Sequence, residues 1–349
     1  MSMMRYKLLG RSGLRVSQLA LGTMTFGEDW GWGASRDESK KQLDAYVAAG
    51  GNFIDTACNY TNGSSEKLVG ELIADRRDRF VVATKYTLAT RADDPNAAGN
   101  HKKNLRHSLE GSLQRLGTDY IDLLWLHAWD FQTPIDEILR ALDDVVRAGK
   151  VLYIGISDTP AWIVSQANTM ADLRGWTPFV ALQVQYSLVQ RAVERELLPM
   201  AKALGLAVTP WGVLGSGILS GKFASAEDRK PDTRLGGTPW GDTQLNAHNV
   251  EIGKLVVTIA KELDKTPSQV AIAWLLAQQA RSEIIPILGA RSASQLVDTL
   301  GAIDVTLSAE QLARLDAATA IDLGFPHDFL ARLDKIILGE QGHRIDRRR

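Results

Sequence analysis

Residues 121–156 read IDLLWLHAWDFQTPIDEILRALDDVVRAGKVLYIGI, and this stretch decides the fold. It opens with a nearly continuous apolar run, residues 121–126, which is typical of a strand buried on both faces. Apolar residues then recur at helical spacing from Ile135 to Val146, and Gly149 ends that pattern. A second apolar run follows at residues 151–156. Strand, helix and strand in this order predict parallel strands joined by a helical crossover.

The same alternation repeats along the chain, which favours a closed (β/α)8 TIM barrel over a doubly wound sheet. No linker divides the chain, so we expect one domain over residues 1–349. Ser35 and Glu38, and likewise Ser308 and Gln311, form capping-box patterns that predict helix starts. We expect strands at residues 19–22, 52–55, 80–84, 121–126, 151–156, 180–184, 206–209 and 284–288.

Two segments do not fit the barrel repeat. Residues 212–249 are rich in Gly, Thr, Pro and Asp, and so long an irregular segment inside a domain is usually functional or disordered. The part from Ser308 onward is expected to add helices outside the barrel.

Composition excludes several classes of protein. The 349 residues include 40 Lys and Arg against 41 Asp and Glu, so the charge gives no reason to expect nucleic acid or a membrane surface as a partner. One cysteine, Cys58, rules out an internal disulfide and fits a reducing cytoplasm. We expect neither a signal peptide nor a membrane-spanning helix, because no apolar run approaches 18 residues. The oligomeric state is not indicated.

Reactive side chains follow the predicted strands, where a barrel enzyme carries its chemistry. Asp55, Lys85 and His127 each end a strand, and Tyr60 follows Asp55 closely. A Lys ammonium lowers the pKa of a neighbouring Tyr phenol, an Asp keeps the Lys charged, and a neutral His can orient a substrate oxygen. This set is a general acid facing a carbonyl group. It contains no nucleophile or metal cage, so it requires an external hydride donor, which indicates a nicotinamide cofactor.

At this point the sequence resembles the aldo-keto reductase superfamily, in its bacterial and potassium-channel β-subunit-like branch. Each matching segment is weak alone, but together they occur in the family's order over roughly residues 5–316. The segments are GGNFIDTA at 50–57, VATK at 82–85, LLWLH at 123–127 with Asp130, GKVLYIGIS at 149–157, LQVQYS at 182–187, LGSGILSGK at 214–222, and PILGAR at 286–291 with Gln295.

The resemblance implies NADP(H)-dependent reduction of a small carbonyl compound, a short N-terminal β-hairpin and a long loop that covers the cofactor. It assigns catalysis to Asp55, Tyr60, Lys85 and His127. It assigns the nicotinamide end of the cofactor to Ser157, Asp158, Gln183 and Trp211, the pyrophosphate loop to Gly212, Leu214, Gly217 and Lys222, the adenosine end to Gly289, Arg291, Ser292, Gln295 and Thr299, and further cofactor contacts to Gly22, Thr23 and Met24.

For the substrate pocket we expect aromatic walls. The candidates lie in the loops after the strands and are Trp30, Trp32, Tyr86 and Trp129, with Trp240 in the long loop. Residues 30–32 could instead only pack on the barrel rim, and the two interpretations are equally open.

Three positions depart from the family's pattern. Asp158 stands where Asn is usual, so it can accept a hydrogen bond from the carboxamide but cannot donate one. Trp211 replaces a common Tyr, and Thr299 replaces an Asn that contacts adenine. Arg291 is the sole strong cation in residues 289–295, a range without an acidic residue, which favours NADP over NAD.

Other functions remain as alternatives. A barrel of this type could bind NADP(H) as a sensor that regulates a partner and have only weak reductase activity, although such a protein would not need all four catalytic residues. A metal-dependent hydrolase is disfavoured, because the six His include no pair at metal-ligand spacing and no metal is expected. The Gly215–Lys222 stretch fails as a phosphate loop, since it is one residue too long and Phe223 replaces Ser or Thr.

Overall fold

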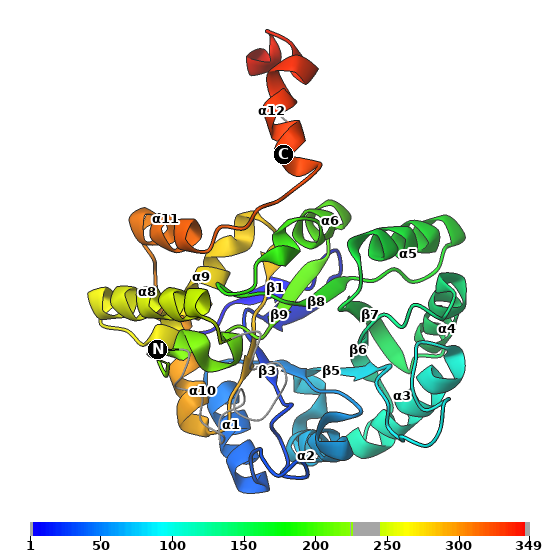
Figure 1. Cartoon of the computed structure of the whole chain (residues 1–349). Helices are drawn as coiled ribbons and strands as arrows, with labels where there is room; N and C mark the ends of the chain where they lie inside the picture. Colours follow the sequence, from blue (N-terminus) through cyan, green and yellow to red (C-terminus); the bar gives the residue numbers. More distant parts are fainter. Residues whose placement is uncertain (1–2, 224, 226–244, 346–349) are drawn as a thin grey trace.

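The strands that follow the N-terminal hairpin form one curled parallel sheet, in which neighbours follow chain order except that the last strand pairs with the first (Figure 1). The computed structural model of the chain describes residues 3–223, 225 and 245–345. Every predicted strand is present. The bounds are β3 (Ala20–Gly22), β4 (Phe53–Asp55), β5 (Val81–Tyr86), β6 (Ile121–Leu126), β7 (Val151–Ser157), β8 (Ala181–Gln185), β9 (Ala207–Trp211), β10 (Glu283–Ile284) and β11 (Ile287–Gly289).

A single segment, residues 283–289, closes the sheet into a barrel. Its first half, β10, pairs with β9, and its second half, β11, pairs with β3. Pro286 lies between the halves and has no amide hydrogen, but its carbonyl accepts a hydrogen bond from Ala20 N at 2.9 Å. The strand predicted at residues 284–288 is therefore broken in two. The (β/α)8 prediction is confirmed.

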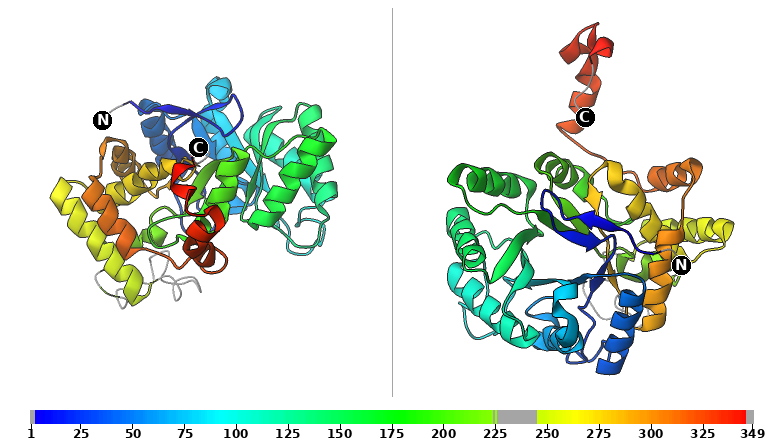
Figure 2. Two further views of the ribbon diagram at one scale, coloured as in Figure 1. Left: turned by 90° about the horizontal axis from the view of Figure 1, so that it is seen from above. Right: turned by 180° about the vertical axis from the view of Figure 1, so that it is seen from behind.

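The helices cover the outer face of the sheet (Figure 2). Short 3-10 turns extend several of them or fill the loops between elements. The helices are α1 (Arg36–Ala48), α2 (Ser64–Ile73), α3 (Lys102–Leu116), α4 (Ile135–Arg147), α5 (Ala161–Arg174), α6 (Leu197–Leu204), α8 (Ala247–Leu263), α9 (Pro267–Ala277), α10 (Ala293–Leu300), α11 (Ala309–Ala318) and α12 (His327–Leu338).

The core has two layers because each strand buries both of its faces. Side chains such as Phe53, Leu123 and Trp125 fill the barrel interior. Ile54, Leu124 and their neighbours on the other strand face pack between the sheet and the helices. This arrangement explains why the strands read as continuous apolar runs in the sequence.

The expected N-terminal hairpin is present and lies against the barrel, as the view from behind shows (Figure 2). It consists of β1 (Tyr6–Leu8) and β2 (Arg15–Ser17), which pair antiparallel. Tyr46 of α1 fixes the end of the hairpin to the first barrel strands. Its buried hydroxyl lies 2.7 Å from Ser17 Oγ and 2.8 Å from the carbonyl oxygens of Leu19 and Phe53.

One of the two predicted capping boxes is complete, and the other forms only in part. At α11, Ser308 accepts from Gln311 N and the Gln311 side chain returns the bond, as predicted. At α1, Ser35 accepts from Glu38 N at 3.4 Å, but the Glu38 carboxylate does not reach back. It accepts instead from Ala293 N at 2.6 Å. The second half of the predicted Ser35 box is wrong, because tertiary packing of α10 against α1 provides another donor for the carboxylate.

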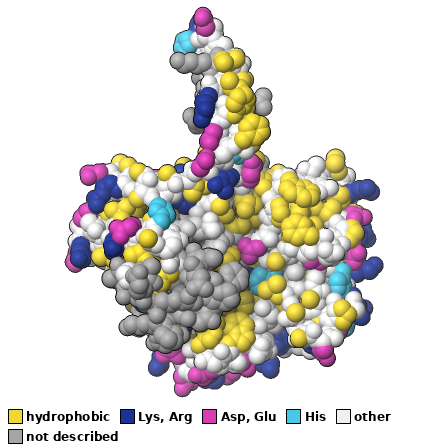
Figure 3. Space-filling view, in the orientation of Figure 1, with side chains coloured by type: hydrophobic (Ala, Val, Ile, Leu, Met, Phe, Trp, Pro, Cys, Tyr) yellow, Lys and Arg dark blue, Asp and Glu magenta, His cyan; other side chains and the backbone are white. Residues whose placement is uncertain are grey.

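The predicted C-terminal helices lie outside the barrel. α11 packs against α8, whereas α12 projects away from the barrel body (Figures 1 and 2). Apolar side chains follow one side of this projecting helix (Figure 3), and they include the exposed Phe329, Ile336 and Ile337. Among the described helices, none is both long enough and apolar enough to span a bilayer. The assignment of residues 1–349 to a single domain stays a prediction.

Part of the predicted irregular segment 212–249 can be described. It begins with a 3-10 turn, η4 (Gly215–Ser220), and α8 starts after its N-cap Asn246. Residues 224 and 226–244, with Trp240, lie outside the described residues, and so does the prediction that this loop covers a cofactor.

The Tyr46 hydroxyl yields a stability prediction. Tyr46→Phe should lower the free energy of unfolding by about 1–3 kcal/mol, because several buried polar groups lose their partner. Urea denaturation measures the change. Tyr6→Phe is the matched control, since the exposed Tyr6 hydroxyl makes a single bond to Gly50 O at 2.9 Å and should cost no more than about 0.5 kcal/mol. Equal losses in the two variants would contradict the role assigned to Tyr46.

Candidate active site

Strand alternation brings the reactive side chains together at one end of the barrel. Successive side chains of a strand point to opposite faces, so a residue two positions after an interior residue also points inward. Four reactive residues follow interior core residues in this way. The pairs are Phe53 and Asp55, Ala83 and Lys85, Trp125 and His127, and Ala181 and Gln183.

A buried ion pair stands at the centre of this end. Lys85 has no exposed side-chain surface, and its ammonium donates to the Asp55 carboxylate, to Thr56 O at 2.8 Å and to Tyr60 Oη at 3.1 Å. The second Asp55 oxygen accepts from Gln183 Nε2 at 3.0 Å. Each of the three ammonium protons therefore has a hydrogen-bond acceptor, and one of them points at the Tyr60 phenol oxygen.

The charges around this ion pair shift the pKa values of Lys85 and of Tyr60. Desolvation opposes the charge of Lys85, but Asp55 and Tyr60 together outweigh it and raise the pKa of Lys85 above its ordinary value. Burial raises the pKa of Tyr60, and the Lys85 ammonium offsets only part of that increase. Lys85 therefore lowers the pKa of Tyr60 as expected, but the pKa stays above its ordinary value because desolvation of the phenolate is the larger effect. Tyr60 consequently carries its proton at neutral pH.

His127 lies beside this phenol and is neutral. Its ring packs edge-on against Tyr60, with centroids 5.9 Å apart and planes at 79°. Desolvation lowers the pKa of His127 well below its ordinary value, and the Lys85 charge lowers it further. Nδ1 is buried without a hydrogen-bond partner. An uncharged imidazole next to a protonated phenol gives two polar groups that can meet one ligand oxygen.

The turn that carries Tyr60 is held in an unusual backbone conformation. Tyr60 begins the 3-10 turn η1 (Tyr60–Gly63), in which Thr61 and Asn62 have φ of 44° and 54°. Thr61 Oγ1 donates to Phe26 O at 2.6 Å, and Asn62 Oδ1 accepts from Trp30 Nε1 at 3.3 Å. The loop after β3 thus fixes the strained turn that positions the phenol.

The residues predicted for the nicotinamide end lie on adjacent strands. Ser157 on β7 is in register with Gln183 on β8, and Trp211 ends β9. Ser157 Oγ is buried without a hydrogen-bond partner. Trp211 Nε1 donates to Asp158 Oδ1 at 3.2 Å. A buried hydroxyl at the end of β7 and an accessible indole ring at the end of β9 fit a ligand that is both flat and polar.

The residues predicted for the pyrophosphate follow Trp211 directly. Gly212 and Gly217 have φ of 67° and 100°, which glycine adopts without strain. Leu214 is half-buried, and Lys222 is exposed. On the other side of the mouth, Thr23 follows β3 and donates to Asp55 O at 3.1 Å, between the buried Gly22 and the half-buried Met24.

The residues predicted for the adenosine end meet at the start of α10, just beyond Gly289. Ser292 caps the helix by accepting from Gln295 N at 3.3 Å, and Arg291 N donates to Gln295 Oε1 at 2.9 Å. The Arg291 guanidinium is exposed and lies 5.7 Å from the Trp32 ring centre. Thr299 does not join this group, because it is buried and its hydroxyl donates to the carbonyls of its own helix.

Sequence reasoning missed Glu38 at this position. Its carboxylate bonds Ala293 N at the N-terminus of α10, beside Arg291 and Ser292. Residues 289–295 contain no acidic residue, but the fold brings one from α1. No signal in the sequence could have revealed it, because Glu38 looked like half of a local capping box.

The predicted substrate residues divide into two groups. Trp30 and Trp32 contact each other with ring centroids 5.5 Å apart, and Trp129 is half-buried. Tyr86 is fully buried, and its hydroxyl donates to Asn100 O at 3.3 Å. The buried Tyr86 side chain has no exposed surface in this structure, and its assignment to the substrate pocket stays a prediction.

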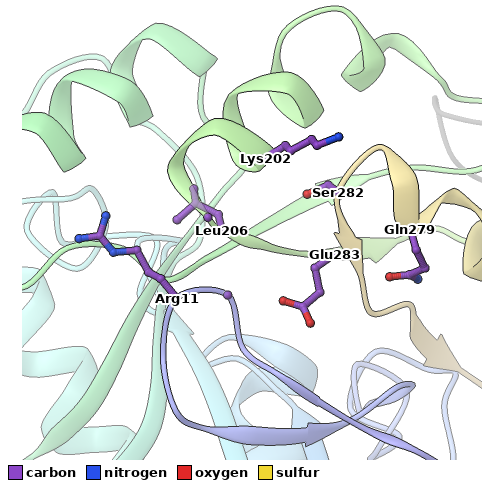
Figure 4. A pocket seen from close by; sticks show the side chains of 8 residues that line it. Arg11, Lys202, Leu206, Gln279, Ser282 and Glu283 are labelled. Carbon is purple, nitrogen blue, oxygen red and sulfur yellow. The ribbon is translucent and has the colours of Figure 1, made fainter. Parts of the chain in front are cut away.

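A separate depression of about 290 Å³ lies next to the N-terminal segment (Figure 4). Two of its charged side chains already bind other groups of the protein. Arg11 pairs with Asp172 at 3.0 Å, and Lys202 donates to Ala280 O at 2.9 Å. Glu283, at the start of β10, also lines it, which places it at the strand beginnings, away from the residues after the strand ends. Nowhere in the described part of the chain do three metal-binding side chains gather.

A parallel barrel with a buried Lys–Asp pair, a Tyr and a His at its strand ends has the architecture of a barrel oxidoreductase. The model of the Aldo/keto reductase family matches residues 18–320, and the chain belongs to that family.

Three fungal proteins are similar over most of their length. Norsolorinic acid reductase of Aspergillus flavus is 40% identical over 333 residues, which are 93% of this chain and 83% of that protein. An aryl-alcohol dehydrogenase of Pestalotiopsis microspora is 39% identical, over 93% and 85% of the two chains. Aryl-alcohol dehydrogenase [NADP(+)] of Phanerodontia chrysosporium is 38% identical, over 90% and 86%.

The neutral state of His127 can be tested without a substrate. In the wild-type protein, imidazole NMR should show His127 titrating well below pH 6.5, and a His127→Gln variant identifies its signal. Lys85→Met should raise the pKa of His127, because the variant removes a nearby positive charge. Titration of His127 at or above pH 6.5 in the wild type would contradict the assigned environment.

Proposed function

We propose that the protein reduces aldehydes or ketones to alcohols with NADPH, and that Tyr60 donates the proton. The observation that carries this proposal is the contact of the buried Lys85 ammonium with both Asp55 and Tyr60, beside a neutral His127. Family membership supports reduction of a carbonyl group.

Each residue of the group has a distinct role. His127 and the Tyr60 hydroxyl meet the carbonyl oxygen and orient it. Tyr60 protonates that oxygen as negative charge develops there, and Lys85 stabilises the resulting phenolate. Asp55 keeps Lys85 charged although the lysine side chain is fully buried. NADPH, when bound, supplies the hydride for the carbonyl carbon.

Several residues would hold the cofactor. Trp211 would offer a ring face for the nicotinamide, and Ser157, Asp158 and Gln183 would bind its carboxamide. Arg291 and Ser292 would receive the 2′-phosphate at the N-terminus of α10, where helix N–H groups favour an anion. The similarity to a protein named as an NADP(+)-dependent dehydrogenase supports this choice of cofactor.

Aromatic carbonyl compounds are the proposed substrate class. Trp30, Trp32 and Trp129 lie around the strand ends, and several relatives are named as aryl-alcohol dehydrogenases. The likeness to the potassium-channel β-subunit-like branch stays a prediction, since the relatives described above carry other names.

A substrate screen tests the function. The loss of NADPH absorbance is followed with a panel of aromatic and aliphatic aldehydes and ketones, and the screen is repeated with NADH. Turnover of aromatic carbonyls supports the proposal. Tight cofactor binding without turnover of any carbonyl would favour the sensor alternative instead.

Tyr60→Phe should lower kcat by about 10²–10⁴-fold while NADPH binding stays intact, because only the proton donor is lost. Tyr120→Phe is the control, since Tyr120 precedes β6 and lies at the other end of that strand. A Tyr60→Phe variant that retains more than half of wild-type kcat would exclude Tyr60 as the donor.

Arg291→Ala should raise the Kd for NADPH by about one to two decades and hardly change the Kd for NADH, because a charge-assisted bond to the 2′-phosphate is lost. Fluorescence titration with both cofactors measures this. Arg106→Ala, an exposed substitution on α3, is the control and should change neither Kd. Equal weakening of both cofactors would remove Arg291 from the phosphate site. The same titration should include NADH binding by the wild type, because the Glu38 carboxylate lies at the proposed phosphate site.

A further inference from the structure

Asp158 places a carboxylate beside the ring that would stack on the nicotinamide. It directly follows β7 with φ of 41°, and its backbone N–H donates to Gln183 O at 3.1 Å. Oδ1 accepts from Trp211 Nε1 at 3.2 Å. A ligand stacked on the face of Trp211 would therefore have this negative charge next to its edge.

No cation neutralises Asp158 directly. Among the residues that the structure describes, no Lys, Arg or His forms an ion pair with it. Lys85 acts on it from a distance, but that ammonium is already bonded to Asp55. The negative charge of Asp158 extends to the catalytic group, where it contributes to the raised pKa of Tyr60. Residue 158 keeps part of its surface open to ligand or solvent, while its carboxylate lies against the Trp211 indole.

We propose that Asp158 makes the site select the oxidised cofactor, NADP⁺, over NADPH. The inference rests on the proposed function, because it requires a nicotinamide at Trp211. The sequence resemblance calls for Asn at this position. An Asn would keep a hydrogen bond to the carboxamide but carry no charge, so the departure changes the electrostatics of the site while leaving its shape almost unchanged.

The physical basis is the charge of the nicotinamide ring. The ring is neutral in NADPH and carries a positive charge in NADP⁺, so a fixed carboxylate attracts only the oxidised form. At a separation of about 6 Å and an effective dielectric constant of about 40, which suits a partly exposed side chain, this attraction corresponds to roughly tenfold in affinity. The overall reaction equilibrium is unchanged, but the enzyme would capture NADP⁺ at low concentration and release it slowly. Such a site suits alcohol oxidation as well as carbonyl reduction.

The ionisation of Asp158 sets the conditions of the test. Desolvation by the surrounding strand ends raises the pKa of its carboxyl to about 6, despite the hydrogen bond from Trp211. At pH 8 the group is therefore ionised in the free protein.

The test measures the Kd values of NADP⁺ and NADPH at pH 8 by calorimetry, for the wild type and for Asp158→Asn. The variant keeps the size of the side chain and an acceptor for Trp211, and Asn tolerates positive φ, so the fold is retained. We expect the Kd for NADP⁺ to rise about tenfold and that for NADPH to change less than twofold. Asp172→Asn, which also removes one negative charge but lies on α5 beside Arg11, should leave both values unchanged.

Three results would overturn the proposal in distinguishable ways. Equal weakening of both cofactors would show that Asp158 acts only through its hydrogen bond. Unchanged Kd values for both cofactors in Asp158→Asn would show that its charge does not reach the ring. If the wild type binds neither cofactor, the proposed function itself fails, and this inference fails with it.

Discussion

A lysine without any exposed surface requires a negative partner, and the Lys85–Asp55 pair is the interaction on which the site depends. Removing two charges from water costs several kcal/mol per ion, and only close contact with further hydrogen bonds compensates for it. Here Thr56 O, Gln183 and Tyr60 provide those bonds. Any group placed beside the pair is therefore held by several contacts at once, and this applies above all to the Tyr60 phenol.

The pair acts differently on its two aromatic neighbours. Desolvation raises the pKa of Tyr60 and lowers the pKa of His127, so both side chains are uncharged at neutral pH. The Lys85 charge opposes the first shift and reinforces the second. One buried cation thus makes the phenol a better acid than burial alone would allow, and it keeps the imidazole neutral.

Two acidic side chains extend this electrostatic pattern to the ends of the proposed cofactor site. Asp158 lies at the nicotinamide end, bonded to Trp211, and Glu38 lies at the adenosine end, bonded to Ala293 N. With the cofactor placed as proposed, the first would favour a cation near the ring, and the second would compete with a phosphate for the start of α10.

The sequence by itself determined the barrel and predicted the residues that meet in the candidate site. Apolar strands alternate with helices that have one apolar face. The two-residue period of a strand places Asp55, Lys85 and His127 on the inner face of the barrel, so the local sequence pattern was sufficient to predict their position. The tertiary structure alone decided the contacts and the burial of three side chains, Glu38, Tyr86 and Asp158. Glu38 bonds the start of α10 instead of its own capping residue, Tyr86 is buried, and Asp158 meets the indole of Trp211. Trp211 lies 53 residues from Asp158 in the chain, and Ala293 lies 255 residues from Glu38. Only packing of separate elements fixes which donor a carboxylate meets and which side chain loses its access to solvent.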